Sequence, residues 1–254
     1  MNIANITVDI GNTRIKYGMV LPDGTEEFHA LPIPPKKEQL APLAAVSPLP
    51  VTWWIAPTGT FPWQELQAEI LNVRPNDQFK ILTRLHIPLK VDVDFPEKVG
   101  IDRLLAAFAA TEKFGDSPML IIDAGTAITV DVVQDQTFYG GAILPGLAIL
   151  SETYPKISGK LPLVSVADSF LKTQPLYPGK NTEDAILNGL YWGTIGAIRQ
   201  FYEMRFPQRE NARLILTGGD AEYLFPGLTQ VLPAQQIEYV EGLVWQGIKR
   251  CIEE

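Results

Sequence analysis

The opening residues place apolar side chains at alternate positions, which is the pattern of half-buried β-strands. Two such stretches, residues 3–9 and 15–20, flank Gly11-Asn12-Thr13. Because glycine and asparagine favour tight turns between strands, the chain is predicted to open with a β-hairpin. The first of its strands ends in an acidic residue, Asp9.

The same order of residue types recurs near the middle of the chain. Residues 119–123 and 128–133 are rich in apolar side chains, and the turn Ala124-Gly125-Thr126 separates them. A third strand is expected at 137–143. In both places an apolar strand ends in Asp and is followed by a glycine and a hydroxyl residue, which we interpret as an internal duplication.

Apolar residues at helical spacing predict helices between and after these strands. Their expected ranges are 63–71, 101–114, 146–154, 182–204 and 241–252. In the longest of them, Asn181 or Thr182 is expected to be the N-cap. Gly189, Gly193 and Gly196 fall near one face of this helix. Because glycine weakens a helix, we expect another helix to pack closely there, as at a subunit interface.

Further strands are expected at 51–55, within a proline-rich and loop-like stretch from 31 to 62, and at 213–217. Strands interleaved with helices, together with an internal repeat, predict an α/β fold of two lobes with mixed sheets flanked by helices. We expect residues 1–115 to form the first lobe and residues 116–254 the second.

Composition and charge narrow the range of partners. The chain of 254 residues has a net charge of −8, and its 21 lysines and arginines are dispersed. Without a basic stripe we expect no nucleic-acid partner. A polyanionic ligand such as ATP would have to be held locally, by backbone N–H groups, one or two cationic side chains and a metal ion.

One cysteine and two histidines leave no basis for an internal disulfide or for a metal site built from these residue types. The first residues lack the charged start and long apolar run of a signal peptide. No apolar run approaches the roughly 20 residues that span a bilayer. We therefore expect a cytoplasmic protein that does not enter a membrane.

The two turns are candidate phosphate-binding elements. Backbone N–H groups after Asp9 could cradle phosphate oxygens, while its carboxylate offers a hard oxygen ligand to Mg²⁺. Lys16 could add a positive charge. Taken alone, this turn could equally belong to an ordinary hairpin whose polar side chains cap their own backbone. The second turn, with Asp123, Gly125 and Thr126, favours phosphate binding because two turns can hold one triphosphate.

Two further segments are ambiguous when each is taken singly. Thr217-Gly218-Gly219 follows a strand, where paired glycines either let the backbone approach a flat ligand such as adenine or only reverse the chain. Asp102 stands at a predicted helix start. It is either a plain first-turn acid stabilised by the helix dipole or a catalytic carboxylate.

Considered together, six segments resemble the motifs of type III pantothenate kinases. They lie in the family's order and comprise Asp9-Ile10-Gly11-Asn12-Thr13, Gly100-Ile101-Asp102-Arg103, Asp123-Ala124-Gly125-Thr126, Gly140-Gly141-Ala142-Ile143-Leu144-Pro145-Gly146, Gly179-Lys180-Asn181-Thr182 and Thr217-Gly218-Gly219. The resemblance implies two ribonuclease-H-like halves, as in acetate kinase, hexokinase and actin, and a homodimer. It also implies transfer of phosphate from ATP to pantothenate, the first step of coenzyme A biosynthesis.

The resemblance further implies roles for individual residues. Asp102 matches the proton acceptor, Asp123 a ligand of a monovalent cation such as K⁺ or NH₄⁺, and Asp9 would hold Mg²⁺ with the nucleotide. Residues expected to contact ATP are Asp9, Ile10, Gly11, Asn12, Thr13, Arg14, Ile15, Lys16, Thr126, Gly218 and Gly219. Residues expected to contact pantothenate are Val93, Gly100, Ile101, Asp102, Arg103 and Thr182.

At one position the chain departs from the family pattern. Val93 stands where a pocket tyrosine is common, and Phe95 could substitute for the missing ring. Two alternatives to a pantothenate kinase follow from the motifs. Phosphate turns are shared with other small-molecule kinases, and some relatives have been described as accessory factors for gene expression. The intact set of Asp9, Asp102 and Asp123 argues against a non-catalytic regulator.

Overall fold

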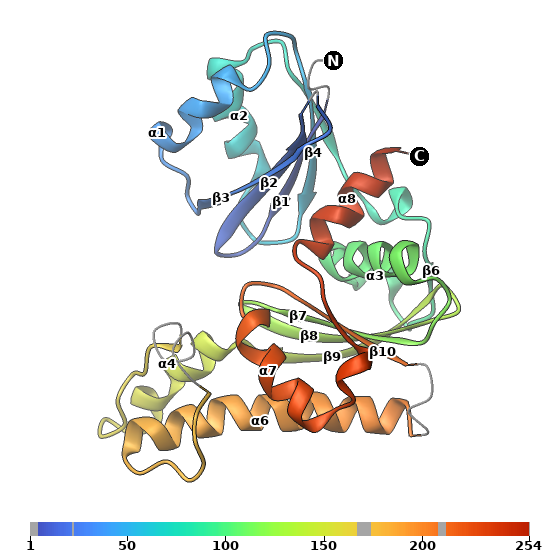
Figure 1. Cartoon of the computed structure of the whole chain (residues 1–254). Coiled ribbons are helices and arrows are strands. Elements are labelled where there is room, and N and C mark those ends of the chain that lie inside the picture. The colour runs from blue at the N-terminus through green and yellow to red at the C-terminus, as the bar shows by residue number, and fades with distance from the viewer. Residues whose placement is uncertain (1–4, 22, 167–173, 208–211, 254) are drawn as a thin grey trace. The chain divides into compact units, whose positions relative to one another are not determined.

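The computed structural model describes residues 5–21, 23–166, 174–207 and 212–253, and the chain forms two compact units (Figure 1). The first unit combines Met1–Leu89 with Phe95–Ala109 and Val244–Glu254, and the second combines Lys90–Asp94 with Ala110–Leu243. The units therefore do not follow the contiguous ranges 1–115 and 116–254. One reason is that the last helix packs on the N-terminal sheet, where Trp245 lies against Gly18.

The first unit is built on a five-stranded mixed sheet. Its strands are β1 (Asn5–Ile10), β2 (Arg14–Val20), β3 (Glu26–Pro32), β4 (Thr52–Pro57) and β5 (Gln78–Ile81), and their order across the sheet is β3-β2-β1-β4-β5. β1, β2 and β3 pair antiparallel, whereas β4 and β5 run parallel to β1. The predicted opening hairpin is thus β1 and β2.

Alternation along β1 gives this sheet two different faces. Ile6, Val8 and Ile10 are buried in a core to which Leu43 and Leu66 also belong. That face is covered by α1 (Lys37–Leu40), the 3₁₀ helix η1 (Ala41–Ala45) and α2 (Trp63–Val73) (Figure 1). The other face carries α8 (Leu243–Glu253), and the first turns of α3 (Ile101–Phe114) pack against α8. Short 3₁₀ helices at Arg84–His86 and Pro96–Lys98 complete the connections.

The second unit repeats the same sheet topology. Its strands are β7 (Met119–Ala124), β8 (Ala127–Gln134), β9 (Thr137–Pro145), β10 (Arg213–Thr217) and β11 (Ile237–Tyr239), with β6 (Lys90–Val91) added at the edge. The order β11-β10-β7-β8-β9-β6 matches that of the first sheet once β6 is set aside. Antiparallel pairing of β7, β8 and β9 and parallel pairing of β7, β10 and β11 match as well.

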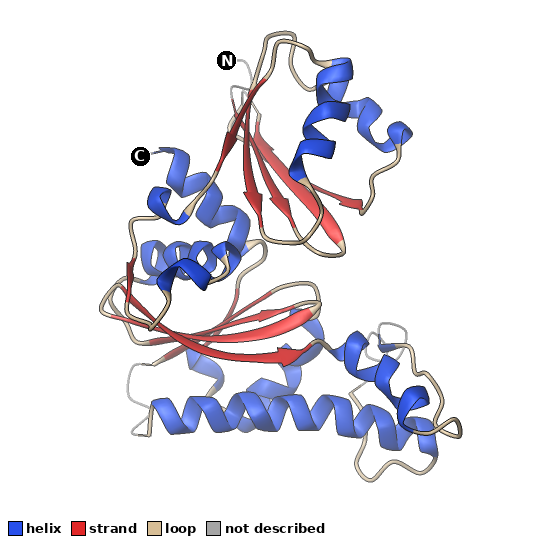
Figure 2. Ribbon diagram, turned by 180° about the vertical axis from the view of Figure 1, so that it is seen from behind, coloured by secondary structure: helices blue, strands red, loops and turns tan. Residues whose placement is uncertain are grey.

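Three helices cover one face of the second sheet (Figure 2). They are α4 (Leu147–Ile157), α6 (Thr182–Arg205) and α7 (Ala221–Val231), and a 3₁₀ helix spans Ala234–Gln236. Their buried apolar side chains, among them Tyr191, Ile198 and Leu224, form one core with Leu120 and Ile122 of β7. The predicted α/β fold and the predicted duplication are both confirmed.

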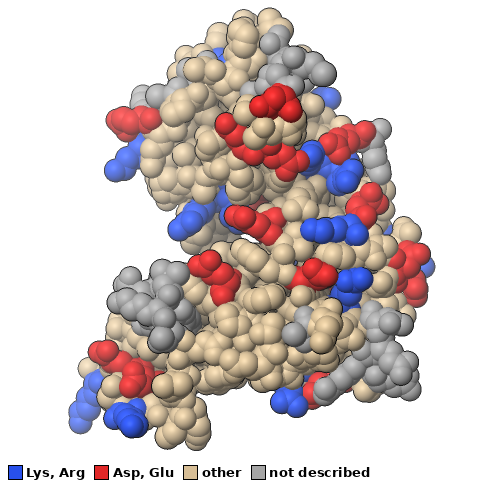
Figure 3. Space-filling model, in the orientation of Figure 1, with Lys and Arg blue, Asp and Glu red and all other residues tan. Residues whose placement is uncertain are grey.

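The strands that the sequence did not predict are short or exposed. β3 is an edge strand in which only Leu31 is buried. It therefore lacks the alternation of buried and exposed residues that marks a strand. β11 has three residues. Among the described residues, no helix combines the length and apolarity needed to cross a bilayer. On the face drawn in Figure 3, lysines and arginines are scattered among acidic side chains.

Candidate active site

The first phosphate-binding turn is centred on Asp9, near the end of β1. Asp9 is only 7% exposed and lies opposite Lys16 of β2 in the antiparallel ladder. The hydroxyl of Thr58 lies 2.6 Å from Asp9 Oδ1 and donates to it. Burial raises the pKa of Asp9 above its usual value, and Thr58 and Lys16 offset part of that rise.

A loop after β4 crosses this turn and fixes its shape. The backbone N–H groups of Thr58 and Gly59 both donate to the carbonyl of Ile10, at 3.1 and 2.6 Å. A Cβ at position 59 would overlap the Gly11 carbonyl, so glycine is required there. The next residue, Thr60, donates its N–H to Asn12 Oδ1 at 3.1 Å. Asn12 is therefore held by the crossing loop.

Sequence reasoning missed this crossing loop, Thr58-Gly59-Thr60. The sequence contained a signal for this loop, because Thr58-Gly59 stands at the end of β4 much as Thr217-Gly218 stands at the end of β10. Comparing the two repeats strand by strand would have found it, whereas the prolines of the surrounding segment suggested only a loop.

Asp102 lies in the same unit, in the first turn of α3. Its side chain bends back over Gly100, where any Cβ would overlap the carboxylate. Burial raises the pKa of Asp102, and the backbone N–H and the charge of Arg103 oppose the rise. The charge of Asp102 in turn raises the pKa of Asp9. Both carboxyl groups therefore belong to the first unit, although 93 positions separate them in sequence.

The second turn lies in the second unit and is crossed in a similar way. Gly218 has φ +98°, and a Cβ there would overlap the Ala124 carbonyl and stand 2.5 Å from Asp123 Oδ1. The N–H of Asp220 donates to the same carbonyl at 2.9 Å. Asp123 and Gly218 therefore lie side by side, where β7 and β10 end. Beside them, the N–H of Gly146 donates to the carbonyl of Thr126 at 3.0 Å.

Asp220 was not predicted as a site residue, but its carboxyl group is unusual. It stands at the N-cap of α7 without a side-chain capping hydrogen bond. Burial raises the pKa of Asp220 to about 6. Perturbed carboxyl groups of this kind gather at functional sites. The signal available in the sequence was its place directly after Gly218-Gly219.

The remaining predicted residues lie at two other places in the second unit. Val93 follows β6, and its Cγ1 lies 3.3 Å from the point that a Cβ on Gly140 would occupy. Gly140 has φ +79°, which favours glycine. Thr182 is the exposed first residue of α6, and the N-cap is Asn181, whose side chain accepts from the N–H of Asp184 at 2.8 Å.

Comparison with known proteins identifies the family. Residues 5–204 match the model of the type III pantothenate kinases. The chain belongs to the type III pantothenate kinase family.

Curated relatives bear the same name. A type III pantothenate kinase from Flavobacterium johnsoniae is 31% identical over 94% of this chain and 95% of its own length. Another, from Persephonella marina, is 36% identical over 59% of this chain. The chain spans just over half the length of the first relatives, 57% of that protein and 54% of one from Rhodopirellula baltica. The predicted family is confirmed.

Solved structures show the fold of this family member more broadly. A conserved protein assigned to the Baf family of transcriptional activators, from Campylobacter jejuni, has a TM-score of 0.60, with 22% identity over 98% of this chain and 97% of that chain. A protein assigned as a 2-dehydro-3-deoxygalactonokinase from Sinorhizobium meliloti has a TM-score of 0.57, with 17% identity over 98% of this chain and 96% of that chain. At these identities the likeness extends to the fold alone.

The carboxyl groups of this pantothenate kinase family member fit a metal that travels with its nucleotide. Among the described residues, no three His, Cys, Asp or Glu side chains form a cluster that could hold a metal ion. Mg²⁺ is commonly bound by one or two carboxylates together with substrate phosphates. Asp9, a buried carboxyl group near the end of β1 beside the first turn, is of the right chemical type for such a role.

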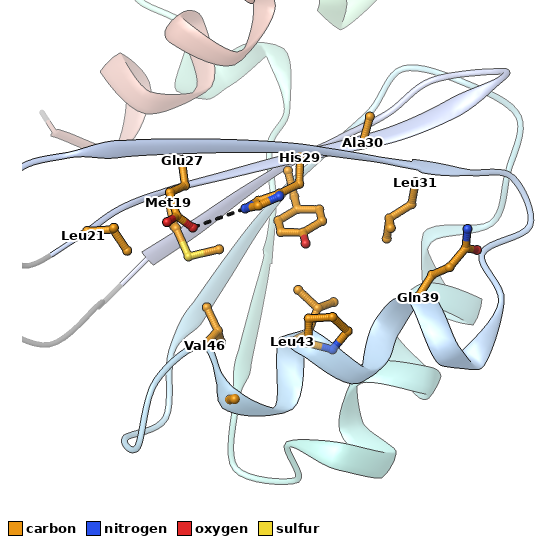
Figure 4. Close-up of a pocket in the computed structure, with 12 residues that line it drawn as sticks. Met19, Leu21, Glu27, His29, Ala30, Leu31, Gln39, Leu43 and Val46 are labelled. Atoms are coloured by element: carbon orange, nitrogen blue, oxygen red, sulfur yellow. Dashed lines mark hydrogen bonds and ion pairs between the residues drawn. The ribbon is translucent and has the colours of Figure 1, made fainter.

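A cavity of about 590 Å³ lies outside the candidate site of the kinase (Figure 4). It opens between β2 and β3 on one side and η1 on the other. Tyr17 and His29 stack along its wall with ring centroids 4.9 Å apart, and His29 Nε2 lies 3.3 Å from Glu27. None of the residues predicted to contact ATP or pantothenate lines it.

Proposed function

We propose that this chain transfers the γ-phosphoryl group of ATP to the primary hydroxyl of pantothenate, giving 4′-phosphopantothenate, the first step of coenzyme A biosynthesis. Membership of the family supports both substrates. The observation that carries the proposal is that one unit holds both Asp9, near the end of β1, and Asp102, in the first turn of α3. One of these carboxyl groups belongs to a phosphate turn and the other to a helix start.

Asp102 acts as the proton acceptor. As the hydroxyl oxygen of pantothenate attacks the γ-phosphorus, its proton passes to the Asp102 carboxylate and the bond from that phosphorus to the leaving ADP oxygen breaks. The raised pKa makes this carboxylate a stronger base than an exposed aspartate. Arg103 supplies positive charge for the substrate carboxylate, and the backbone of Gly100 and Ile101 completes this side of the pocket.

The two turns hold the nucleotide. Residues Asp9 to Lys16 surround the phosphates with backbone N–H groups and one lysine, and Thr126, Gly218 and Gly219 contact the nucleotide from the second unit. Mg²⁺, held by Asp9 and the nucleotide, neutralises phosphate charge during transfer. Asp123 holds the monovalent cation, K⁺ or NH₄⁺. The carbonyls gathered near Asp123, such as that of Ala124, are ligands of a suitable kind.

Val93 and Thr182 contribute the rest of the pantothenate pocket, and we propose that a homodimer completes it. The exposed glycines of α6 support this assembly, because Cβ atoms at Gly193 and Gly196 would meet nothing within 4 Å in a single chain. That leaves room for a second helix. The cytoplasmic location expected from the sequence stays a prediction.

The experiment that tests this function is ADP release from Mg-ATP with and without pantothenate, in K⁺ and in Na⁺. We expect release that depends on pantothenate and is stimulated by K⁺. Asp102→Asn should lower kcat by about 10²- to 10⁴-fold, because it removes the proton acceptor while keeping its shape. The matched control is Asp116→Asn, an exposed aspartate that should leave kcat unchanged.

Two outcomes would contradict the proposal. Full turnover by Asp102→Asn would remove the proposed base. Release of ADP with a sugar or another acid, but not with pantothenate, would favour the other small-molecule kinases considered from the sequence. Nucleotide binding without turnover on any of these acceptors would favour the non-catalytic regulator.

A further inference from the structure

The last helix, α8, packs its buried tryptophan on the strand that follows the first phosphate turn. Trp245 is 7% exposed, and its indole occupies the space above Gly18 of β2, where any Cβ would overlap the ring. Phe28 of β3 meets the indole edge-on, with ring centroids 5.5 Å apart. Gly18 lies two residues beyond Lys16, so α8 contacts the phosphate hairpin directly.

The helix α8 also packs against α3, the helix that carries Asp102. A Cβ at Gly247 would overlap the carbonyl of Leu105, and the Leu105 Cα would stand 3.0 Å from it. This is a contact between the backbones of α8 and α3, within the first unit (Figure 1). Leu105 follows Asp102 by three residues, which is about 4.5 Å along a helix.

We propose that Trp245 and Gly247 are positioning residues that set the distance between the first phosphate turn and Asp102. The inference rests on the proposed function, since it gives Asp102 the role of base. Trp245 fixes α8 to β2, and Gly247 fixes α8 to α3. The C-terminal helix is thus a spacer between β2, which follows the first phosphate turn, and α3, which carries Asp102.

The indole nitrogen of Trp245 strengthens this interpretation. In the part of the chain that the structure describes, the buried Nε1 of Trp245 has no hydrogen-bond partner. A buried donor without a partner lowers the stability of the folded state. Phenylalanine would keep an aromatic ring here and avoid that cost. Tryptophan has a larger ring than phenylalanine and an unsatisfied donor. Its presence here is therefore consistent with selection for the spacing that the indole gives.

The outer side of α8 offers a matched control. Lys249 forms an ion pair with Glu26 of β3, but partly exposed pairs of this kind contribute little. Arg250 is more exposed still and contacts only Glu253 among the ion pairs described. Arg250→Ala changes the same helix without touching β2 or α3, so it should leave both kcat and KM unchanged.

The experiment compares Gly247→Ala with this control. The added methyl group must push α8 and α3 apart near Asp102, and misplacement of a reacting group by about 1 Å can cost on the order of a hundredfold in rate. We expect kcat to fall about 10- to 100-fold, with nucleotide KM changed less than about twofold. The acid limb of the kcat–pH profile should move to lower pH as the Asp102 carboxyl becomes better hydrated.

Trp245→Phe and Trp245→Ala give a second test that loosens the contact instead of crowding it. Phenylalanine should retain more kcat than alanine, because it keeps a ring over Gly18. Positioning is contradicted if Gly247→Ala or Trp245→Ala lowers only the melting temperature, while kcat and the pH profile stay as in the parent protein. That result differs from failure of the proposed function, which would appear as unimpaired turnover by Asp102→Asn.

Discussion

The first and second units build similar turns on the same sheet topology, yet they use them differently. In the first, a loop after β4 donates to the Ile10 carbonyl, and in the second, a loop after β10 donates to the Ala124 carbonyl. Gly59 and Gly218 each occupy a place where a Cβ would overlap backbone. The duplicated part is therefore a turn with a crossing loop, which is more than a strand order.

What distinguishes the two turns is the polar group that each crossing loop presents. Thr58 donates a hydroxyl hydrogen bond to Asp9 in the first. In the second, Asp220 adds a carboxyl group whose pKa is raised by burial, and its N–H donates to the Ala124 carbonyl. The first turn also interacts with Asp102 of α3. Under the proposed function, the differences in one crossing residue and one neighbouring helix would give the shared scaffold a catalytic side and a nucleotide-holding side.

The largest expected difference between the turns is in catalysis. Asp9→Asn removes the proposed Mg²⁺ ligand, and we expect kcat/KM for ATP to fall at least about 100-fold, or near 3 kcal/mol. Asp123→Asn should cost less and should abolish the advantage of K⁺ over Na⁺. Steady-state kinetics of both variants in both salts measure this. Equal losses, with K⁺ stimulation intact in both, would show that the turns have not divided these roles.

A smaller effect is expected from the glycine that crosses the second turn. Gly218→Ala forces a positive φ and an overlap with Ala124, a strain of about 1 to 3 kcal/mol. We expect a lower melting temperature and a higher KM for ATP. For the melting temperature, Gly219→Ala is the matched control, because a Cβ there meets nothing within 4 Å. If both variants have the same melting temperature as the parent protein, the crossing loop does not constrain the turn.

The smallest effect is on the pH dependence of stability. Burial raises the pKa of Asp220 to about 6 in the folded chain, above the ordinary aspartate value of 3.8. Folding therefore favours the neutral form of this carboxyl group. Any stability linked to this group is fully present below about pH 4 and is lost as pH rises through 6. Asp220→Asn should therefore raise the free energy of unfolding at pH 8 by on the order of 1 kcal/mol after allowance for partial exposure. The measurement is the melting temperature at pH 8, which should rise.

The control for Asp220→Asn is the same variant measured at a lower pH. At pH 4.5, where the parent carboxyl is already largely neutral in the folded chain, the gain should be much smaller. A gain that is the same at pH 4.5 and pH 8 would assign the effect to the amide itself and not to the charge.

Local signals in the sequence were enough for much of this architecture. The strand–Asp–turn repeat predicted the duplicated units, and Asn181 was among the two expected N-caps. Long-range contacts were beyond such reasoning. Thr58 meets Asp9 across 49 positions, and Trp245 meets Gly18 across more than 200. Neither contact leaves a periodic pattern, because each depends on which strands become neighbours.

The docking of α8 on β2 also bears on how the protein is made. Glu26 and Lys249, which form an ion pair, are 223 positions apart, so the ribosome needs roughly 10 to 50 s to pass from one to the other. Until then the outer face of the N-terminal sheet, including Gly18 and Phe28, has no helix α8 over it. The contiguous span 110–243 holds nearly all of the second unit and can mature first. The hairpin of β1 and β2 is therefore made long before α8, and it is among the last parts of the first unit to acquire its complete surroundings.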